Sequence, residues 1–281
     1  MPHELSSYNF ISIYIWKDLF DFFYLITEEN LCIFAKNKIG TFMYLPPQGK
    51  RTSREAIETC FKIMDGENES CAVSRIENIE KNEVRLYESM GLKIVPKDRE
   101  YVCRRDSLVE LKGDRFKSKR AASNYFLKNY CFSFEDFKPQ FKEECLELYL
   151  RWVSNRENKY PDPIYGEMLK SSFFAHKKAV ENFHRLGLRG KVLKIDDKIS
   201  GYTFGYPINK QTFCVCFEIT DLKIKGASQF IFREFCAELV GYDYINIMDD
   251  SGLVNLRRTK LSYHPFLEIE SFIAKRDESR T

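Results

Sequence analysis

One stretch of the chain gathers cations at helical spacing. Residues 112–128 hold six basic side chains and one acid, Asp114; the cations are Lys112, Arg115, Lys117, Lys119, Arg120 and Lys128. On a helix, several of them would form one basic stripe, a surface that can follow the phosphates of a nucleic acid. Tyr125 or Phe126 would then stack on a base. The alternative is a solvated helix face whose aromatic residues enter the core.

A second segment, 256–265, combines cations with hydrogen-bond donors. Arg257 and Lys260 lie three residues apart, so on a short helix they would share a face. Ser262, Tyr263 and His264 add donors at the same end. Such a set would hold phosphates, bind substrate through Ser262 and place the Tyr263 hydroxyl near a transferred group. Ordinary surface cations on a C-terminal helix are the alternative.

Glu218 is the first candidate for the base that a group-transfer reaction needs. If its strand alternates regularly, Glu218 shares a mostly apolar face with Cys214 and Cys216, opposite residues 213, 215 and 217. A carboxylate on such a face has a raised pKa that suits proton transfer. The alternative is a strand-end acid paired with Lys223 or Lys225.

Asp249 and Asp250 end a later apolar stretch, 242–250, and are the other acidic candidates. We expect one of them to cap a helix predicted at 253–260. The other would recognise an amino group of the substrate. We take Asp249 as the second candidate base and Asp250 as the substrate-binding residue.

The composition indicates a globular protein without a strong overall charge. A chain of 281 residues suits two domains. With 44 basic and 41 acidic residues, an anion site must come from local clustering. Nine cysteines without a CxxC pair and four histidines without ligand spacing predict reduced thiols and no metal site. Reduced thiols are typical of a cytosolic protein, so we expect a cytoplasmic location. Charges in the aromatic N-terminal segment exclude a good membrane span there.

The order of the predicted elements indicates the fold. The first half alternates short strands and helices, including a helix at 53–65 capped by Ser53. The second half predicts helices at 141–156 and 167–187, strands at 191–196, 199–208 and 211–220, helix 226–241, strand 242–250, helix 251–260 and strand 266–275. This order resembles the GCN5-related N-acetyltransferase (GNAT) fold. We predict an α/β (α+β) protein of tandem duplicated GNAT-like acyltransferase domains, 1–128 and 129–281, with mixed, mostly antiparallel sheets flanked by helices.

Four segments, 46–49 (PPQG), 101–126, 217–235 and 245–265, make a more specific match. They resemble the C-terminal domain of phosphatidylglycerol lysyltransferases, a family with stand-alone bacterial members. The pattern consists of Gly113, Phe116, Lys119, Arg120, Asn124, Phe126, Leu256, Arg257, Lys260, Ser262, Tyr263 and Pro265. The resemblance implies aminoacyl transfer from aminoacyl-tRNA to a phospholipid head group or a small acceptor. Lys119, Arg120, Asn124, Arg257 and Lys260 would then bind the donor phosphates, without a required cofactor.

Two further hypotheses stay open. Acetyltransferases cradle a pyrophosphate where this chain has KIKGAS, so Gly226 would serve an acyl-coenzyme A donor. Met248 stands where family members usually have an acid, and Phe232 where they often have Asn. These two departures suggest another substrate or a nucleotide-binding or nucleic-acid-binding protein without turnover. With a lipid acceptor, we expect a peripheral position at the membrane.

Overall fold

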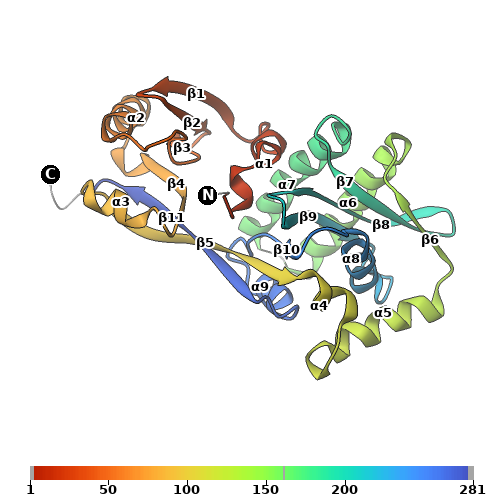
Figure 1. Cartoon of the computed structure of the whole chain (residues 1–281). Helices are drawn as coiled ribbons and strands as arrows, with labels where there is room; N and C mark the ends of the chain where they lie inside the picture. The colour runs from red at the N-terminus through yellow and green to blue at the C-terminus, as the bar shows by residue number, and fades with distance from the viewer. Residues whose placement is uncertain (1–2, 161, 278–281) are drawn as a thin grey trace.

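A computed structural model describes residues 3–160 and 162–277. In this part of the chain, eleven strands form one mixed sheet in the order β1-β2-β3-β4-β11-β5-β10-β9-β8-β7-β6 (Figure 1). The strands are β1 (Asp21–Thr27), β2 (Asn30–Lys36), β3 (Thr41–Met43), β4 (Arg75–Glu80), β5 (Lys93–Arg104), β6 (Phe132–Asp136), β7 (Arg189–Ile195), β8 (Lys198–Pro207), β9 (Thr212–Thr220), β10 (Tyr244–Asn246) and β11 (Leu267–Lys275).

Nine α-helices flank this sheet in the described residues. They are α1 (Phe10–Ile15), α2 (Arg54–Glu67), α3 (Val84–Ser89), α4 (Arg105–Glu110), α5 (Lys117–Asn129), α6 (Lys142–Lys159), α7 (Pro163–Glu181), α8 (Ala227–Glu238) and α9 (Val254–Leu261). Ser53 caps α2 as predicted, since its side chain accepts a hydrogen bond from the Ala56 amide at 3.2 Å. None of the described helices has the length and apolarity needed to span a membrane.

The sheet joins two halves, which we define as β1–β5 and β6–β10. Strand β5 of the first half pairs with β10 of the second, and β11 inserts between β4 and β5. Figure 1 shows β5 and β11 running together from one half to the other. The last strand of the chain thus lies among strands of the first half. The domain boundary at residue 128 stays a prediction.

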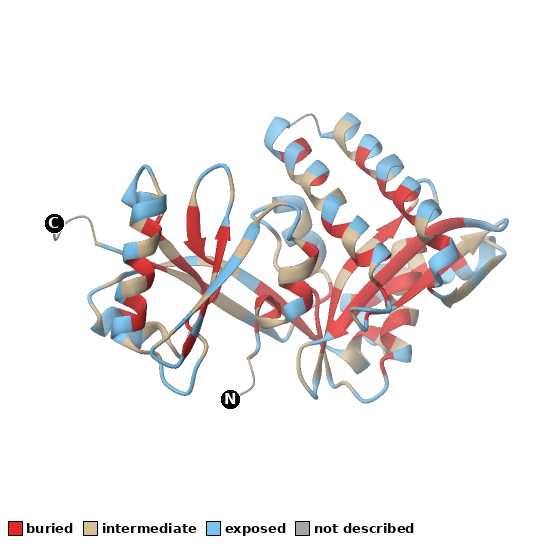
Figure 2. Cartoon of the chain, turned by 90° about the horizontal axis from the view of Figure 1, so that it is seen from above, coloured by how far each residue is buried: buried red, intermediate tan, exposed pale blue. Residues whose placement is uncertain are grey.

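Helices cover both faces of the second half. Helices α6 and α7 pack on one face, where Tyr149 and Ala179 join a core with Tyr202 of β8. Helices α5 and α8 pack on the other, where Phe126 and Ile231 meet Leu193 of β7. Figure 2 shows the buried residues of the sheet continuing beneath these helices. Side chains of β9 therefore point either toward α6 and α7 or toward α8.

A β-bulge in β9 makes one prediction wrong. Phe204 of β8 pairs with Phe217 and Gly205 with Val215, so Cys216 has no partner residue in β8. The extra residue reverses the alternation. Cys214 therefore joins the core beneath α6 and α7, whereas Val215 joins the core beside α8. Beyond the bulge Phe217 belongs to the α6–α7 side, so residues 213, 215 and 217 do not share one face.

The parallel strands β9 and β10 separate beyond their first three pairs. Their register runs from Tyr244 opposite Thr212 to Asn246 opposite Cys214, where β10 ends. The chain turns away after Asn246, and Met248 has a positive φ of 63°. Strand β9 continues to Thr220 without β10 beside it. This separation exposes one edge of β9 in the middle of the sheet and makes room for a ligand there.

Candidate functional site

Two adjoining pockets open around the free edge of β9. The inter-half pocket has a volume of about 870 Å³ and lies between the two halves, with Ser6, Trp16, Asp98, Glu100 and Asp249 in its wall. The β9 pocket has about 520 Å³ and is lined by residues that include Trp152, Arg156, Glu218, Ser228, Phe232 and Tyr263. Both have the size of ordinary ligand sites.

The two pockets share part of their walls. The shared residues are Met168, Ser172, His176, Cys216, Ser251, Leu256 and Lys260. A ligand in one pocket would therefore meet a ligand in the other beside the β9 bulge. This arrangement suits a reaction in which a donor and an acceptor enter separately.

Glu218 lies in the wall of the β9 pocket, next to the first turn of α8. The Ser228 hydroxyl donates a hydrogen bond of 2.7 Å to its carboxylate. Burial raises the pKa of Glu218 to about 7, although Ser228 and Lys119 oppose the shift. No ion pair joins Glu218 to Lys223 or Lys225 in the described residues, and Lys225 lies over the Tyr125 ring at 4.4 Å. A base with this pKa can accept a proton near neutral pH.

The two cationic segments meet beside Glu218. The Lys119 ammonium of α5 lies 4.0 Å from the centroid of the Tyr263 ring, which follows α9. Burial lowers the pKa of Lys119, while the charge of Glu218 raises it. The His264 ring also bonds to the Arg115 carbonyl oxygen at 3.1 Å. The segments that the sequence analysis singled out separately thus lie in one neighbourhood.

Lys260 points inward from α9 and forms part of the wall that both pockets share. Its ammonium donates hydrogen bonds to the carbonyl oxygens of Ile247 and Asp249. Burial lowers its pKa, and the nearby carboxylate of Asp249 opposes that shift. An ammonium has three donors, so one N–H of Lys260 is left for a ligand.

Other predicted ligand-binding residues lie away from both pockets. The Arg120 guanidinium donates to the carbonyl oxygens of Leu111 and Gly113, and so holds the turn before α5. Asn124 and Arg257 are exposed, and neither lines a pocket. Ser262 is half-buried outside the pocket walls and donates to the Thr259 carbonyl oxygen at 2.6 Å.

Gly226 precedes α8 at a point that α5 covers. Its φ is +85°, and a Cβ atom on it would lie 2.2 Å from the Ala122 carbonyl oxygen. This contact and the positive φ explain why the residue is a glycine, so a ligand is not needed to explain it. The helix start that would cradle a pyrophosphate is packed against α5.

Asp249 and Asp250 shape the turn after β10. Asp249 accepts a hydrogen bond from the Ser251 amide at 2.7 Å, and Asp250 accepts one from the Gly252 amide at 3.0 Å. The Tyr101 hydroxyl also donates to Asp250. Helix α9 has no side-chain cap, so the prediction that one of these acids caps it was wrong. Only Asp249 of the two lines a pocket.

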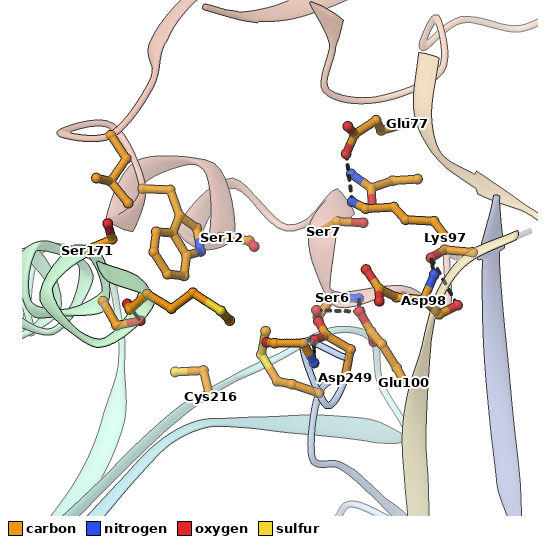
Figure 3. Close-up of a pocket in the computed structure, with 18 of the residues that line it drawn as sticks. Ser6, Ser7, Ser12, Glu77, Lys97, Asp98, Glu100, Ser171, Cys216 and Asp249 are labelled. Carbon is orange, nitrogen blue, oxygen red and sulfur yellow. Dashed lines mark hydrogen bonds and ion pairs between the residues drawn. The ribbon is translucent and has the colours of Figure 1, made fainter. Parts of the chain in front are cut away.

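The inter-half pocket carries several carboxylates. Glu100 accepts hydrogen bonds from the Ser6 amide at 3.0 Å and from the Asn246 side chain at 2.5 Å. Figure 3 shows Ser6 and Glu100 beside Asp249, with the Lys97–Glu77 ion pair on the same side of the pocket as Glu100. Burial raises the pKa of Glu100. The acidic character of this wall suits an amino group.

Sequence reasoning missed His176. Its Nδ1 forms a 2.8 Å hydrogen bond with the Tyr202 hydroxyl, and its ring lies 3.9 Å from that of Phe217. Burial lowers its pKa to about 3, so the imidazole is neutral at physiological pH. Its Nε2 has no hydrogen-bond partner among the described residues. A histidine on the apolar face of α7 was the available signal, but its partner comes from a distant strand.

The two departures from the family pattern both face the pockets. Met248 lines the inter-half pocket, and Phe232 lines the β9 pocket. Phe232 packs edge-on against Tyr263, with ring centroids 4.8 Å apart. Both pocket walls are therefore apolar at the positions where the resemblance predicts a polar group.

Solved structures share this fold. A conserved protein of unknown function from Bacteroides thetaiotaomicron is 26% identical, with a TM-score of 0.83 over 96% of this chain and 90% of that one. L-PGS from Bacillus licheniformis is 19% identical, with a TM-score of 0.65 over 96% and 88%. FemX is 8% identical, with a TM-score of 0.54 over 99% and 92%. The predicted acyltransferase fold is therefore confirmed.

Comparison with curated proteins gives no match. One family model, described as phosphatidylglycerol lysyltransferase, C-terminal, matches residues 1–275, which is nearly the whole chain. The predicted resemblance is thereby confirmed, and the chain belongs to the phosphatidylglycerol lysyltransferase C-terminal family.

Proposed function

We propose that this protein transfers an aminoacyl group from aminoacyl-tRNA to a lipid-linked or small-molecule acceptor. One observation carries the proposal: Glu218, with a pKa raised to about 7, lines a pocket that shares a wall with a second pocket. The β9 pocket would hold the donor ester, and the inter-half pocket the acceptor.

Glu218 would act as the general base. The acceptor hydroxyl or amine attacks the ester carbonyl carbon, and its proton passes to the Glu218 carboxylate. Collapse of the tetrahedral intermediate breaks the bond to the ribose oxygen. That oxygen takes the proton from the protonated Glu218 and leaves as the free hydroxyl of the tRNA, so atoms and charge balance and the carboxylate is restored.

Lys260 and His176 would stabilise the oxygen that becomes negative during the attack. Both line the two pockets, Lys260 has one donor left, and a neutral His176 can donate from Nε2. Tyr263, stacked under Lys119, would orient the transferred group. Asp249 in the acidic wall is suited to an amino group, while Asp250 would act through the turn it holds.

Side chains outside the pockets would contact the donor first. Arg257 on the α9 segment and Asn124 on the α5 segment are both exposed, and the ends of these segments meet at His264 and Arg115. Arg257 and Lys119 would attract the phosphates of the RNA acceptor end, and the neutral Asn124 amide would donate a hydrogen bond to them. A lipid acceptor would place the protein, otherwise cytoplasmic, at the membrane surface.

Two alternatives rest on narrower observations. Coenzyme A as donor would need the start of α8, which α5 covers at Gly226, so this alternative has less support. Nucleotide or nucleic-acid binding without turnover is favoured by Met248 and Phe232 in the pocket walls.

The test is a transfer assay with purified protein. Transfer RNA charged with each radiolabelled amino acid in turn is mixed with protein and with vesicles containing phosphatidylglycerol, or with a soluble metabolite extract. We expect protein-dependent loss of label from the RNA for at least one amino acid, and label in the lipid or metabolite fraction. Unchanged labelled RNA with every amino acid would overturn the proposal.

A further inference from the structure

We propose that the α6 end of the β9 pocket binds a terminal nucleotide of the donor RNA, with Trp152 stacked on the base and Arg156 paired with a phosphate. The choice of an RNA ligand rests on the proposed function. The site itself rests on the side chains that α6 and α7 contribute to this pocket.

Arg156 is a partly buried cation without an anionic partner in the described chain. No hydrogen bond or ion pair joins its side chain to another described residue, and its Nε is buried without a hydrogen-bond acceptor. The adjacent acid, Glu157, instead lies 3.9 Å from Lys170. The buried Nε–H of this guanidinium is costly unless a ligand supplies an acceptor, and phosphate matches the fork of donors that Arg156 presents.

Aromatic rings line the same part of the pocket as this cation. The Arg156 guanidinium carbon lies 5.1 Å from the Trp152 ring centroid, and the Tyr149 ring lies 5.9 Å from Trp152. Tyr160 and Tyr165, also in the pocket wall, meet edge to face with centroids 6.4 Å apart. Stacking of a base on an aromatic side chain contributes about 1–3 kcal/mol.

The combination selects a nucleotide over simpler ligands. An aliphatic chain would gain nothing from the charge of Arg156, and a free phosphate would gain nothing from Trp152. A base joined to a phosphate uses both groups. The site also fits the proposed chemistry, because the same pocket reaches Glu218 and Ser228. A nucleotide bound at α6 would present its ribose ester toward that carboxylate.

The two tryptophans of the chain provide a direct readout. Trp152 lines the β9 pocket and Trp16 lines the inter-half pocket. In the Trp16→Phe variant, Trp152 is the only tryptophan, so stacking of a base should quench its fluorescence. The probe is the RNA trinucleotide CCA, titrated into the full chain at low salt.

We expect saturable quenching in Trp16→Phe and little change in the matched Trp152→Phe variant, which reports from the other pocket. Adding Arg156→Gln to Trp16→Phe should weaken binding roughly tenfold or more, and Arg156→Lys less, because lysine keeps the charge but loses the fork. Thermal melting checks that each variant is folded.

Two results would overturn the subsite: unquenched Trp152 at millimolar trinucleotide, or an affinity that Arg156→Gln leaves unchanged. The transfer assay separates this failure from that of the proposed function. Transfer without quenching would retain the function and remove the subsite. Quenching that depends on Arg156, without transfer, would retain the subsite in a nucleotide-binding protein and remove the function.

Discussion

Two glutamates, one in each half, have surroundings with opposite effects on their pKa values. Glu77 of β4 lies 2.8 Å from Lys97 and 2.7 Å from Arg75. Burial opposes its ionisation, but these two cations hold its pKa below the usual value. Glu218 of β9 accepts a hydrogen bond from Ser228, and burial raises its pKa to about 7. Charge neutralisation makes Glu77 part of the framework, whereas Glu218 can exchange a proton.

Strand lengths differ at the two parallel pairings of the sheet. Strand β3 has three residues, pairs in parallel with β4 at a single position, and is soon followed by Pro46 and Pro47. Strand β9 has nine residues and runs past the end of its parallel neighbour β10. Under the proposed function, the second half would supply the reactive carboxylate and the first half one wall of the acceptor pocket.

The strongest way to break this comparison is to remove the proton acceptor. Glu218→Gln keeps the shape of the side chain and its contact with Ser228 but cannot accept a proton. We expect transfer to fall by about 10²-fold or more, as for loss of a general base. The matched control is Glu88→Gln, because Glu88 is exposed on α3. A Glu218→Gln protein with the wild-type rate would remove the assignment.

The two halves also differ in how far their helix starts are covered. Helix α2 begins with an exposed Arg54, whereas the start of α8 lies beneath α5. Gly226→Ala adds a Cβ atom that would meet the Ala122 carbonyl oxygen and also strains a positive φ. We expect it to lower the free energy of unfolding by about 3 kcal/mol, from strain and overpacking together.

Gly187→Ala is the matched control for Gly226→Ala, measured by denaturant unfolding. Gly187 has φ +63°, but no atom lies within 4 Å of the position that a Cβ atom would take. Only the backbone strain of about 1–2 kcal/mol should appear there. Equal losses in the two variants would mean that α5 does not press on the start of α8.

The framework role of Glu77 gives a smaller expected effect. Glu77→Gln leaves Lys97 without its carboxylate, although the Asn78 side chain still accepts from Lys97 at 2.8 Å. The Lys97 side chain is 25% exposed, so we expect a loss of about 2 kcal/mol, below the cost for a fully buried pair. Adding Lys97→Met to Glu77→Gln should recover part of the lost free energy of unfolding in a double-mutant cycle. Additive losses would contradict the pairing.

Local pattern carried the prediction of the elements and of some site residues. The helical and alternating periods of the second half identify α6 to β11 in order, because each period reflects one buried face. Glu218 was recognisable as an acid in an apolar strand. Lys119, Lys260 and Tyr263 came from the family pattern, and the structure places all three around Glu218 and the pockets.

Long-range geometry was not recoverable from the same pattern. The Cys216 bulge depends on the pairing of β9 with β8, so the alternation alone assigned the wrong faces. The insertion of β11 between β4 and β5 joins segments far apart in the chain. His176 and Arg156 resemble ordinary helix residues in the sequence, because Tyr202 and the pocket that define them come from other elements.

The pH dependence of the transfer rate is the smallest effect that we expect, and it tests the contrast between Glu218 and Glu77. With a pKa of about 7, Glu218 is mostly protonated at pH 6 and mostly ionised at pH 8. Transfer measured at limiting donor should therefore rise about tenfold over this range, because only the ionised carboxylate accepts the proton.

Stability should move in the other direction with pH. The pKa of Glu218 is higher in the folded chain than in the unfolded chain, so the protonated side chain stabilises the folded state. This stabilisation is lost as the pH rises from 4.5 to about 7. The Glu218→Gln variant removes this effect and should gain in melting temperature over wild type as the pH rises. Glu77 acts in the opposite sense, because its lowered pKa makes its contribution present above the ordinary glutamate pKa and lost on acidification. A flat rate profile between pH 6 and pH 8, with parallel melting curves for wild type and Glu218→Gln, would place both glutamates in the framework.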